Sequence, residues 1–238
     1  MTTHESPAGK SGTLIWDLPL RLCHWLLVLS VLGCWVTYRI GIEAFNWHVW
    51  CGYTVLVLAA FRIVWGFVGP RHARFANFVR GPVTMGRYAR SLLDPDPTQR
   101  YAGHNPLGAL MVVLLLVLLG VEALTGLFAN DEVVSSGPLY GYVEDATSDA
   151  WSRLHRLGAK VVWVAVWLHI AAVLSYLLVK RDNLILPMIT GRKHQPWLSP
   201  EEGVASSQVW RALLIAAIWA ALVYWLVETA PSPSLILF

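Results

Sequence analysis

The fold of this chain is decided by one apolar stretch, residues 154–179, which reads LHRLGAKVVWVAVWLHIAAVLSYLLV. A helix of that length exceeds the roughly 30 Å thickness of a bilayer's hydrocarbon core, because each residue adds about 1.5 Å. The stretch also holds two histidines, His155 and His169. Ionisable side chains inside a membrane are costly and are usually functional. The stretch therefore predicts a membrane-spanning helix that carries two functional side chains.

Four other apolar runs are long enough to cross a bilayer. The chain of 238 residues is 56% hydrophobic and only 14% charged, which is more apolar surface than a soluble domain of this size buries. We therefore predict an all-α integral membrane protein with five spanning helices and the lipid bilayer as its solvent. The four other runs are residues 20–38, 46–68, 106–128 and 209–227.

The charged residues of the connections predict the orientation of the chain in the membrane. The connection between the second and third runs is rich in arginine, whereas the next connection is acidic. Since basic loops stay on the cytoplasmic side, we predict that the N-terminus lies inside and the C-terminus outside, after five crossings. The net charge of +3 is too small to indicate a nucleic-acid partner. The first of these connections contains Arg71, Arg74, Arg80, Arg87, Arg90 and Arg100 against Asp94 and Asp96. The acidic connection after the third run contains Asp131, Glu132, Glu144, Asp145 and Asp149.

Four histidines lie in the predicted helices at matched depths. His155 and His169 are fourteen residues apart, which is about 21 Å along a helix with only about 40° of rotation. The first helix starts on the cytoplasmic side just before His24, and the second starts on the outer side just before His48. Depth therefore pairs His24 with His169 and His48 with His155. The other four histidines, His4, His72, His104 and His194, fall in the tail or the loops and are predicted to be solvated.

Two facing pairs of imidazoles are what axial ligation of two iron porphyrins requires of a helix bundle. The sequence has no Cys-x-x-Cys-His motif, so any haem would be b-type, held without covalent attachment. Iron with both axial positions filled is suited to electron transfer rather than to oxygen chemistry. The alternatives are hydrogen-bonded core histidines, or a zinc or copper site, which would need three or four ligands at one depth.

Other side chains near these levels are candidates for holding the cofactor. Arg62 follows His48 by fourteen residues, so it shares that face and could pair with a haem propionate; alternatively it extends to the interface. Gly52 and Gly158, one turn from His48 and His155, would let a porphyrin approach the backbone.

Glu122 is the only acid in the third predicted helix, near its outer end. A carboxyl group there is a candidate for proton exchange with a quinol, although solvation at the interface would explain it equally well.

Three motifs occur together in the first, second and fourth predicted helices. They are Trp16-Asp17-x-Pro19-x-Arg21-x-x-His24-Trp25, then His48-x-x-x-Gly52-Tyr53, and the pair His155 and His169. With these motifs the chain resembles the bacterial cytochrome b561 family and the related cytochrome b subunits of membrane-bound nickel-iron hydrogenases. The resemblance covers roughly residues 13–192.

The resemblance implies a four-helix transmembrane bundle with two haems b, located in the bacterial inner membrane. The family's haem ligands match His24, His48, His155 and His169 one for one, and Arg21 is a further candidate for binding the cofactor. The resemblance also implies exchange of electrons with membrane quinone and with a periplasmic partner, either a c-type cytochrome or a partner oxidoreductase subunit.

The chain departs from short cytochromes b561 in its arginine-rich connection and its fifth helix, which leaves the partner open. We accordingly predict a flexible cytoplasmic tail over residues 1–12 and a di-haem cytochrome b domain over 13–192. Residues 193–238 would form a cytoplasmic connection and the fifth helix, with a periplasmic C-terminus.

The predicted function is electron transfer between the quinone pool and that periplasmic partner. An alternative within the family is superoxide oxidation with reduction of ubiquinone, since Arg153 and Arg156 beside His155 could attract an anion or bind propionates. An alternative of another class is a histidine-dependent transporter of metal ions or protons, which would predict broken helices and mid-membrane acids. A structural anchor would not explain the matched histidines.

Overall fold

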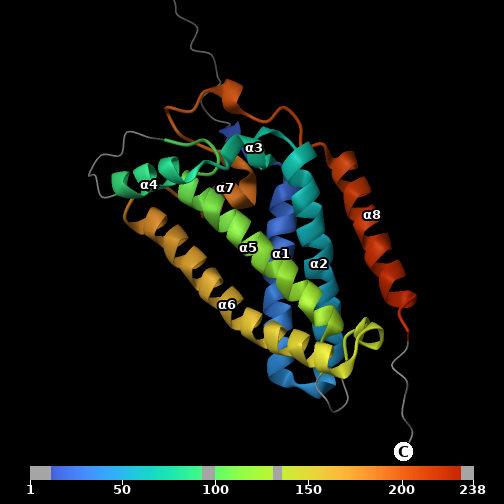
Figure 1. Ribbon diagram of the computed structural model, residues 1–238. Coiled ribbons are helices and arrows are strands. Elements are labelled where there is room, and N and C mark those ends of the chain that lie inside the picture. Colours follow the sequence, from blue (N-terminus) through green and yellow to red (C-terminus); the bar gives the residue numbers. More distant parts are fainter. Residues whose placement is uncertain (1–11, 93–99, 131–135, 232–238) are drawn as a thin grey trace, which may run out of the picture.

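The computed structural model describes residues 12–92, 100–130 and 136–231 (Figure 1). The predicted tail up to residue 11, together with His4, Asp94, Asp96, Asp131 and Glu132, lies outside the described residues.

Five long helices are apolar enough to cross a membrane, as predicted. Most of their ends agree with the expected runs within a few residues. The fourth differs, because a polar turn starting at Asp145, after the N-cap residue Glu144, extends the helix beyond its apolar part. The helices are α1 (Leu18–Ile40), α2 (Phe45–Val68), α5 (Pro106–Phe128), α6 (Asp145–Leu178) and α8 (Val209–Glu228).

Four of these helices form the core of the bundle. Helix α1 packs against α2, α2 against α5, and α5 against α6, while α8 lies outside this group against α2 (Figure 1). Large apolar side chains such as Leu29, Phe67 and Trp210 are exposed on the bundle surface, where lipid would cover them. The prediction of a four-helix transmembrane bundle with a fifth C-terminal helix is confirmed.

The two ends of the bundle differ in charge. The N-terminal strand lies at one end with the short helices η3 (Arg71–Ala73), α3 (Phe75–Phe78), α4 (Pro82–Ser91) and α7 (Ile185–Thr190), and we call this the basic end (Figure 1). The opposite end, which we call the acidic end, carries η2 (Ile42–Ala44), η4 (Tyr140–Tyr142) and the start of α6. Helix α8 ends at the acidic end, as five crossings require (Figure 1).

The start of α1 is tied to the rest of the basic end by buried polar contacts. The carboxylate of Asp17 caps α1 by accepting from the Leu20 amide at 3.0 Å and from Nε1 of Trp65 on α2 at 3.0 Å. Strand β1 (Thr13–Leu14) pairs antiparallel with β2 (Arg192–Lys193), so the predicted domain boundary after residue 192 falls inside β2.

Gly191 closes α7 next to this two-stranded sheet. Its φ of +82° lies in the left-handed region, and a Cβ there would come within 2.8 Å of the Trp16 carbonyl oxygen. The Gly191 carbonyl accepts from the amides of Ile15 and Trp16 at 2.8 and 3.1 Å. A glycine is therefore needed for the chain after α6 to reach the start of α1.

Candidate functional site

The structure brings together the same histidine pairs that were predicted from their depths in the membrane. Near the basic end, the rings of His24 on α1 and His169 on α6 have centroids 6.4 Å apart. Near the acidic end, the rings of His48 on α2 and His155 on α6 have centroids 6.3 Å apart. Each pair therefore consists of two imidazoles that face one another across the bundle core.

These separations fit a single metal ion between the two rings of each pair. An ion bonded to one nitrogen of each imidazole at about 2.0 Å would hold the ring centroids roughly 6 Å apart. Both pairs have that spacing. Among the described residues, no group of three or more histidine, cysteine or acidic side chains is placed to hold a metal ion, so the histidines meet in twos. Two protein ligands on one axis are what an iron porphyrin accepts.

Hydrogen bonds fix both rings of the pair near the acidic end. Nδ1 of His48 donates to the Cys34 carbonyl oxygen at 2.9 Å, and Nδ1 of His155 donates to the Glu122 carbonyl oxygen at 3.0 Å. A metal-bound histidine usually donates its second ring nitrogen to a carbonyl or carboxylate in this way. The arrangement leaves Nε2 of each ring as the free electron-pair donor.

The side chain of Glu122 points into the bundle rather than to the interface. Its Oε1 lies 3.2 Å from Nδ1 of His155, and its side chain is only 16% exposed. Oε2 is buried without a hydrogen-bond partner in the described part of the chain, and it occupies the space beside Gly158. Solvation at the interface therefore does not account for Glu122.

The two glycines proposed to admit a porphyrin differ in their surroundings. A Cβ at Gly52 would meet no atom within 4 Å, so open space lies beside the backbone one turn from His48. The corresponding space at Gly158 is filled by the Glu122 carboxylate. The geometry thus supports close approach of a flat group at Gly52, and such a role for Gly158 stays a prediction.

Arg62 is buried on α2 and does not extend to the interface. It is 6% exposed, with its guanidinium 5.0 Å from the ring centroid of Phe75 and 5.9 Å from that of Phe78. Its two terminal nitrogens have no hydrogen-bond partner among the described residues. A buried charge needs an anionic partner, and a haem propionate would provide one.

The pair near the basic end is less constrained by the protein. Nδ1 of His24 is buried without a hydrogen-bond partner in the described ranges. Arg21, one turn before His24, donates to the Ile189 carbonyl at the end of α7. This contact ties α1 to α7, and a direct role of Arg21 in binding the cofactor stays a prediction.

The expectation that His72 and His104 are solvated is wrong. His104 packs between the rings of Trp16 and Phe78, with centroids 4.6 and 4.4 Å away, and burial lowers its pKa to about 3. Nε2 of His72 donates to the Glu202 carbonyl oxygen at 2.7 Å, and burial also lowers the pKa of His72. The arginine-rich connection folds back onto the bundle, which no sequence periodicity indicates.

Comparison with known proteins places these features in a family. Residues 15–191 match the family described as prokaryotic cytochrome b561, a range that includes all four paired histidines and ends before α8. No solved structure matches the chain.

The similar curated proteins carry the name "Probable Ni/Fe-hydrogenase B-type cytochrome subunit". The relative from Azotobacter chroococcum mcd 1 is 28% identical over 79% of this chain and 90% of its own length. Those from Rhizobium leguminosarum bv. viciae and Cupriavidus necator are each 26% identical. They cover 81% and 77% of this chain, and 97% and 88% of the relatives. The chain therefore matches these relatives over most of their length.

Proposed function

Since this chain belongs to the prokaryotic cytochrome b561 family, we propose that it carries electrons across the bacterial inner membrane through two haems b, between the quinone pool and a periplasmic redox partner. The family itself implies haem b and electron transfer in the membrane. The observation that supports two sites is the pair of ring separations, 6.4 and 6.3 Å, at two depths of one bundle.

In this proposal His24 and His169 hold one haem, and His48 and His155 hold the other. A haem b bound in this way supplies reversible one-electron exchange at its iron. The four histidines would hold the two groups, and the carbonyl oxygens of Cys34 and Glu122 orient the rings of His48 and His155. Because His155 and His169 are fourteen residues apart on α6, the two sites lie about 21 Å apart along that helix.

The side chains around the histidines have separate proposed roles. The buried guanidinium of Arg62 would neutralise a propionate, and the open space at Gly52 would admit the porphyrin. Glu122 is the acid placed to exchange a proton with a quinol, because its carboxylate contacts His155.

The redox partner is proposed from the names of the relatives and from the charge at the two ends of the bundle. In this proposal the basic end faces the cytoplasm, so the acidic end, where α8 finishes, would face the periplasm. A hydrogenase-like oxidoreductase subunit at the acidic end is the first candidate, because the curated relatives are named as hydrogenase subunits. A soluble c-type cytochrome is the second.

The alternatives make different demands on the same site. Superoxide oxidation would use Arg153 and Arg156, both exposed beside His155, and it predicts ubiquinone reduction by superoxide without a protein partner. Metal-ion transport would need more ligands than the two histidines that meet at each depth.

The first experiment is a reduced-minus-oxidised optical spectrum of the purified protein, with haem b counted by the pyridine haemochrome method. We expect about two haems b per chain, both six-coordinate and low-spin. One haem per chain would mean that only one of the two histidine pairs binds haem. A well-folded chain without haem would refute the proposal and favour metal-ion transport. Reduction of the haems by a quinol, and their oxidation by a hydrogenase-type partner or a c-type cytochrome, would then separate the partners.

A further inference from the structure

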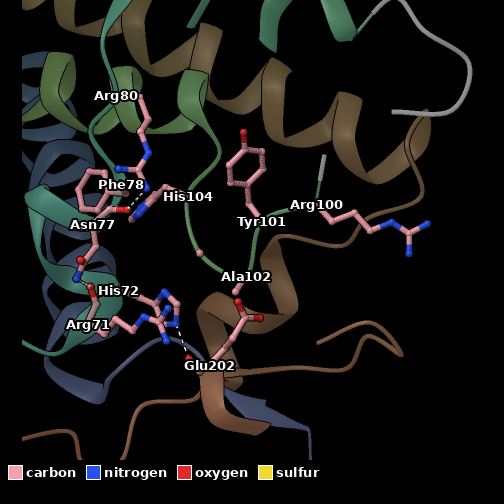
Figure 2. A pocket seen from close by; sticks show the side chains of 11 residues that line it. Arg71, His72, Asn77, Phe78, Arg80, Arg100, Tyr101, Ala102, His104 and Glu202 are labelled. Carbon is pink, nitrogen blue, oxygen red and sulfur yellow. Dashed lines mark hydrogen bonds between the residues drawn. The ribbon is translucent and has the colours of Figure 1, made fainter. Parts of the chain in front are cut away.

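A cavity of about 250 Å³ lies at the basic end, outside the two histidine pairs (Figure 2). Three stretches of the chain form it: residues 71–80, which include η3 and α3, residues 100–104 before α5, and Glu202 in η5 (Pro200–Glu202). Since a water molecule takes up about 30 Å³, the cavity has room for a phosphate group and several waters.

The lining of this cavity is predominantly basic. The guanidiniums of Arg71, Arg80 and Arg100 stand against one described carboxylate, that of Glu202. Figure 2 shows Arg80 running toward His104 and Arg71 toward His72, while Arg100 extends away from both. None of the acids in the described ranges forms an ion pair with these arginines. Two inward guanidiniums therefore lack an anionic partner within the described structure.

Hydrogen bonds shape the cavity, and one of them holds the side chain of Arg80. Arg80 donates to the Asn77 carbonyl oxygen at 2.8 Å, and the amide of Asn77 donates to the Arg71 carbonyl oxygen at 2.5 Å. His72 joins η3 to η5 through its hydrogen bond to Glu202. The His72 contact therefore joins two distant parts of the chain around the cavity, and the exposed Arg71 and Arg80 lie at its opening.

One buried group in the cavity wall adds to the preference for an anion. Nδ1 of His104, in the cavity wall, is buried without a hydrogen-bond partner in the described chain, and a neutral imidazole can donate one N–H. The buried guanidinium of Arg62 lies behind Phe78, 5.9 Å from its ring centroid, and is kept for the haem propionate proposed above.

We propose that this cavity is a binding site for a phosphate group, supplied either by the headgroup of an anionic lipid or by free phosphate. Planar guanidiniums match phosphate oxygens with paired hydrogen bonds, and two such side chains line this cavity. The site lies at headgroup level, because η3 follows the end of α2 closely and His104 comes just before α5 begins. Binding of a phosphate group in this cavity would not depend on quinone or on a redox partner.

The test uses the haem-loaded full chain in two kinds of lipid nanodisc. In discs of phosphatidylcholine and phosphatidylglycerol, native mass spectrometry counts the phosphatidylglycerol molecules retained after release. In discs of phosphatidylcholine alone, calorimetry measures the binding of inorganic phosphate. The pocket variant is Arg71→Gln/Arg80→Gln. The matched control is Arg74→Gln/Arg87→Gln, which removes two exposed arginines of the same connection that do not line the cavity.

If the ligand is a lipid headgroup, we expect one phosphatidylglycerol molecule to be retained per chain. If the ligand is free phosphate, we expect one phosphate ion to bind per chain. Removing a guanidinium should weaken binding about fivefold, so the pocket variant should lose at least tenfold while the control loses less than twofold. Unchanged haem content in both variants shows that they are folded. An equal loss in the two variants would mean diffuse attraction to basic residues, and it would overturn the proposal. Absence of binding in both kinds of disc would also overturn it.

Discussion

Nδ1 of His48 on α2 lies 2.9 Å from the carbonyl oxygen of Cys34 on α1. The ring that faces His155 on α6 is therefore oriented by a third helix. On the opposite side, His155 is held in the same way by Glu122 of α5. Each of the four core helices thus contributes either a ligand or an orienting contact to the site near the acidic end. Correct ligand geometry at this site depends on the packing of the whole bundle.

Replacing one histidine of a pair should remove one haem and leave the other. We expect His169→Ala to keep about one haem b per chain, because the acidic-end pair is untouched and lies about 21 Å away along α6. Pyridine haemochrome counting of the purified variant checks this. The exposed His194 provides the control, since His194→Ala should retain the full complement. Retention of both haems in His169→Ala would contradict the assigned ligands.

Glu122→Gln should raise the reduction potential of the haem near the acidic end. The carboxyl group lies 3.2 Å from Nδ1 of His155, and in its ionised form it makes that ring a stronger electron donor to iron. Loss of the charge should shift the potential upward by roughly 50 mV, about 1 kcal/mol for one electron. A spectroelectrochemical titration resolves the two haems. The exposed Glu43 is the control, and an equal shift in Glu43→Gln would show a general charge effect.

Asp17→Ala should destabilise the chain by about 2–4 kcal/mol, because it removes an N-cap and leaves the buried Trp65 N–H unpaired. Asp17→Asn keeps an acceptor oxygen and should cost clearly less. Thermal loss of the helical circular-dichroism signal in detergent compares the two variants. Equal effects of alanine and asparagine would show that the hydrogen bonds contribute little.

His104 should make the protein less stable in acid. Burial lowers its pKa to about 3 in the folded chain, against about 6.5 when unfolded, so the unfolded state binds more protons between these values. The free energy of unfolding should therefore rise with pH across that window, by up to about 1.4 kcal/mol per pH unit. His104→Gln removes this slope, which urea unfolding at pH 7 and pH 5 would detect.

The exposed His194 again supplies the control for that experiment. His194→Gln, at an exposed position, should leave the free energy of unfolding at pH 7 unchanged. An unchanged slope in His104→Gln would mean that other groups, such as the neighbouring His72, account for the acid sensitivity.

The positions of the membrane-spanning helices and the pairing of the four histidines follow from short-range regularities of the sequence. A bilayer demands about twenty consecutive apolar residues, so the five helices could be located within a few residues of their ends. The fixed rise and rotation of a helix place His155 and His169 on one face at two depths. Neither inference depends on how the helices pack. The early start of α6 was missed because its first turns are polar and resemble a loop.

Only the tertiary structure decided what surrounds the histidines. That Glu122 turns inward to His155, that Arg62 is buried beneath Phe75 and Phe78, and that α8 lies outside the core against α2 all depend on contacts between distant segments. The same is true of the basic cavity, whose walls combine residues 71–80 and 100–104 with Glu202. The sequence by itself determined which residues cross the membrane and at what depth each lies, because backbone geometry and the apolar solvent set both. Side-chain partners depend on packing between helices, which no local pattern encodes.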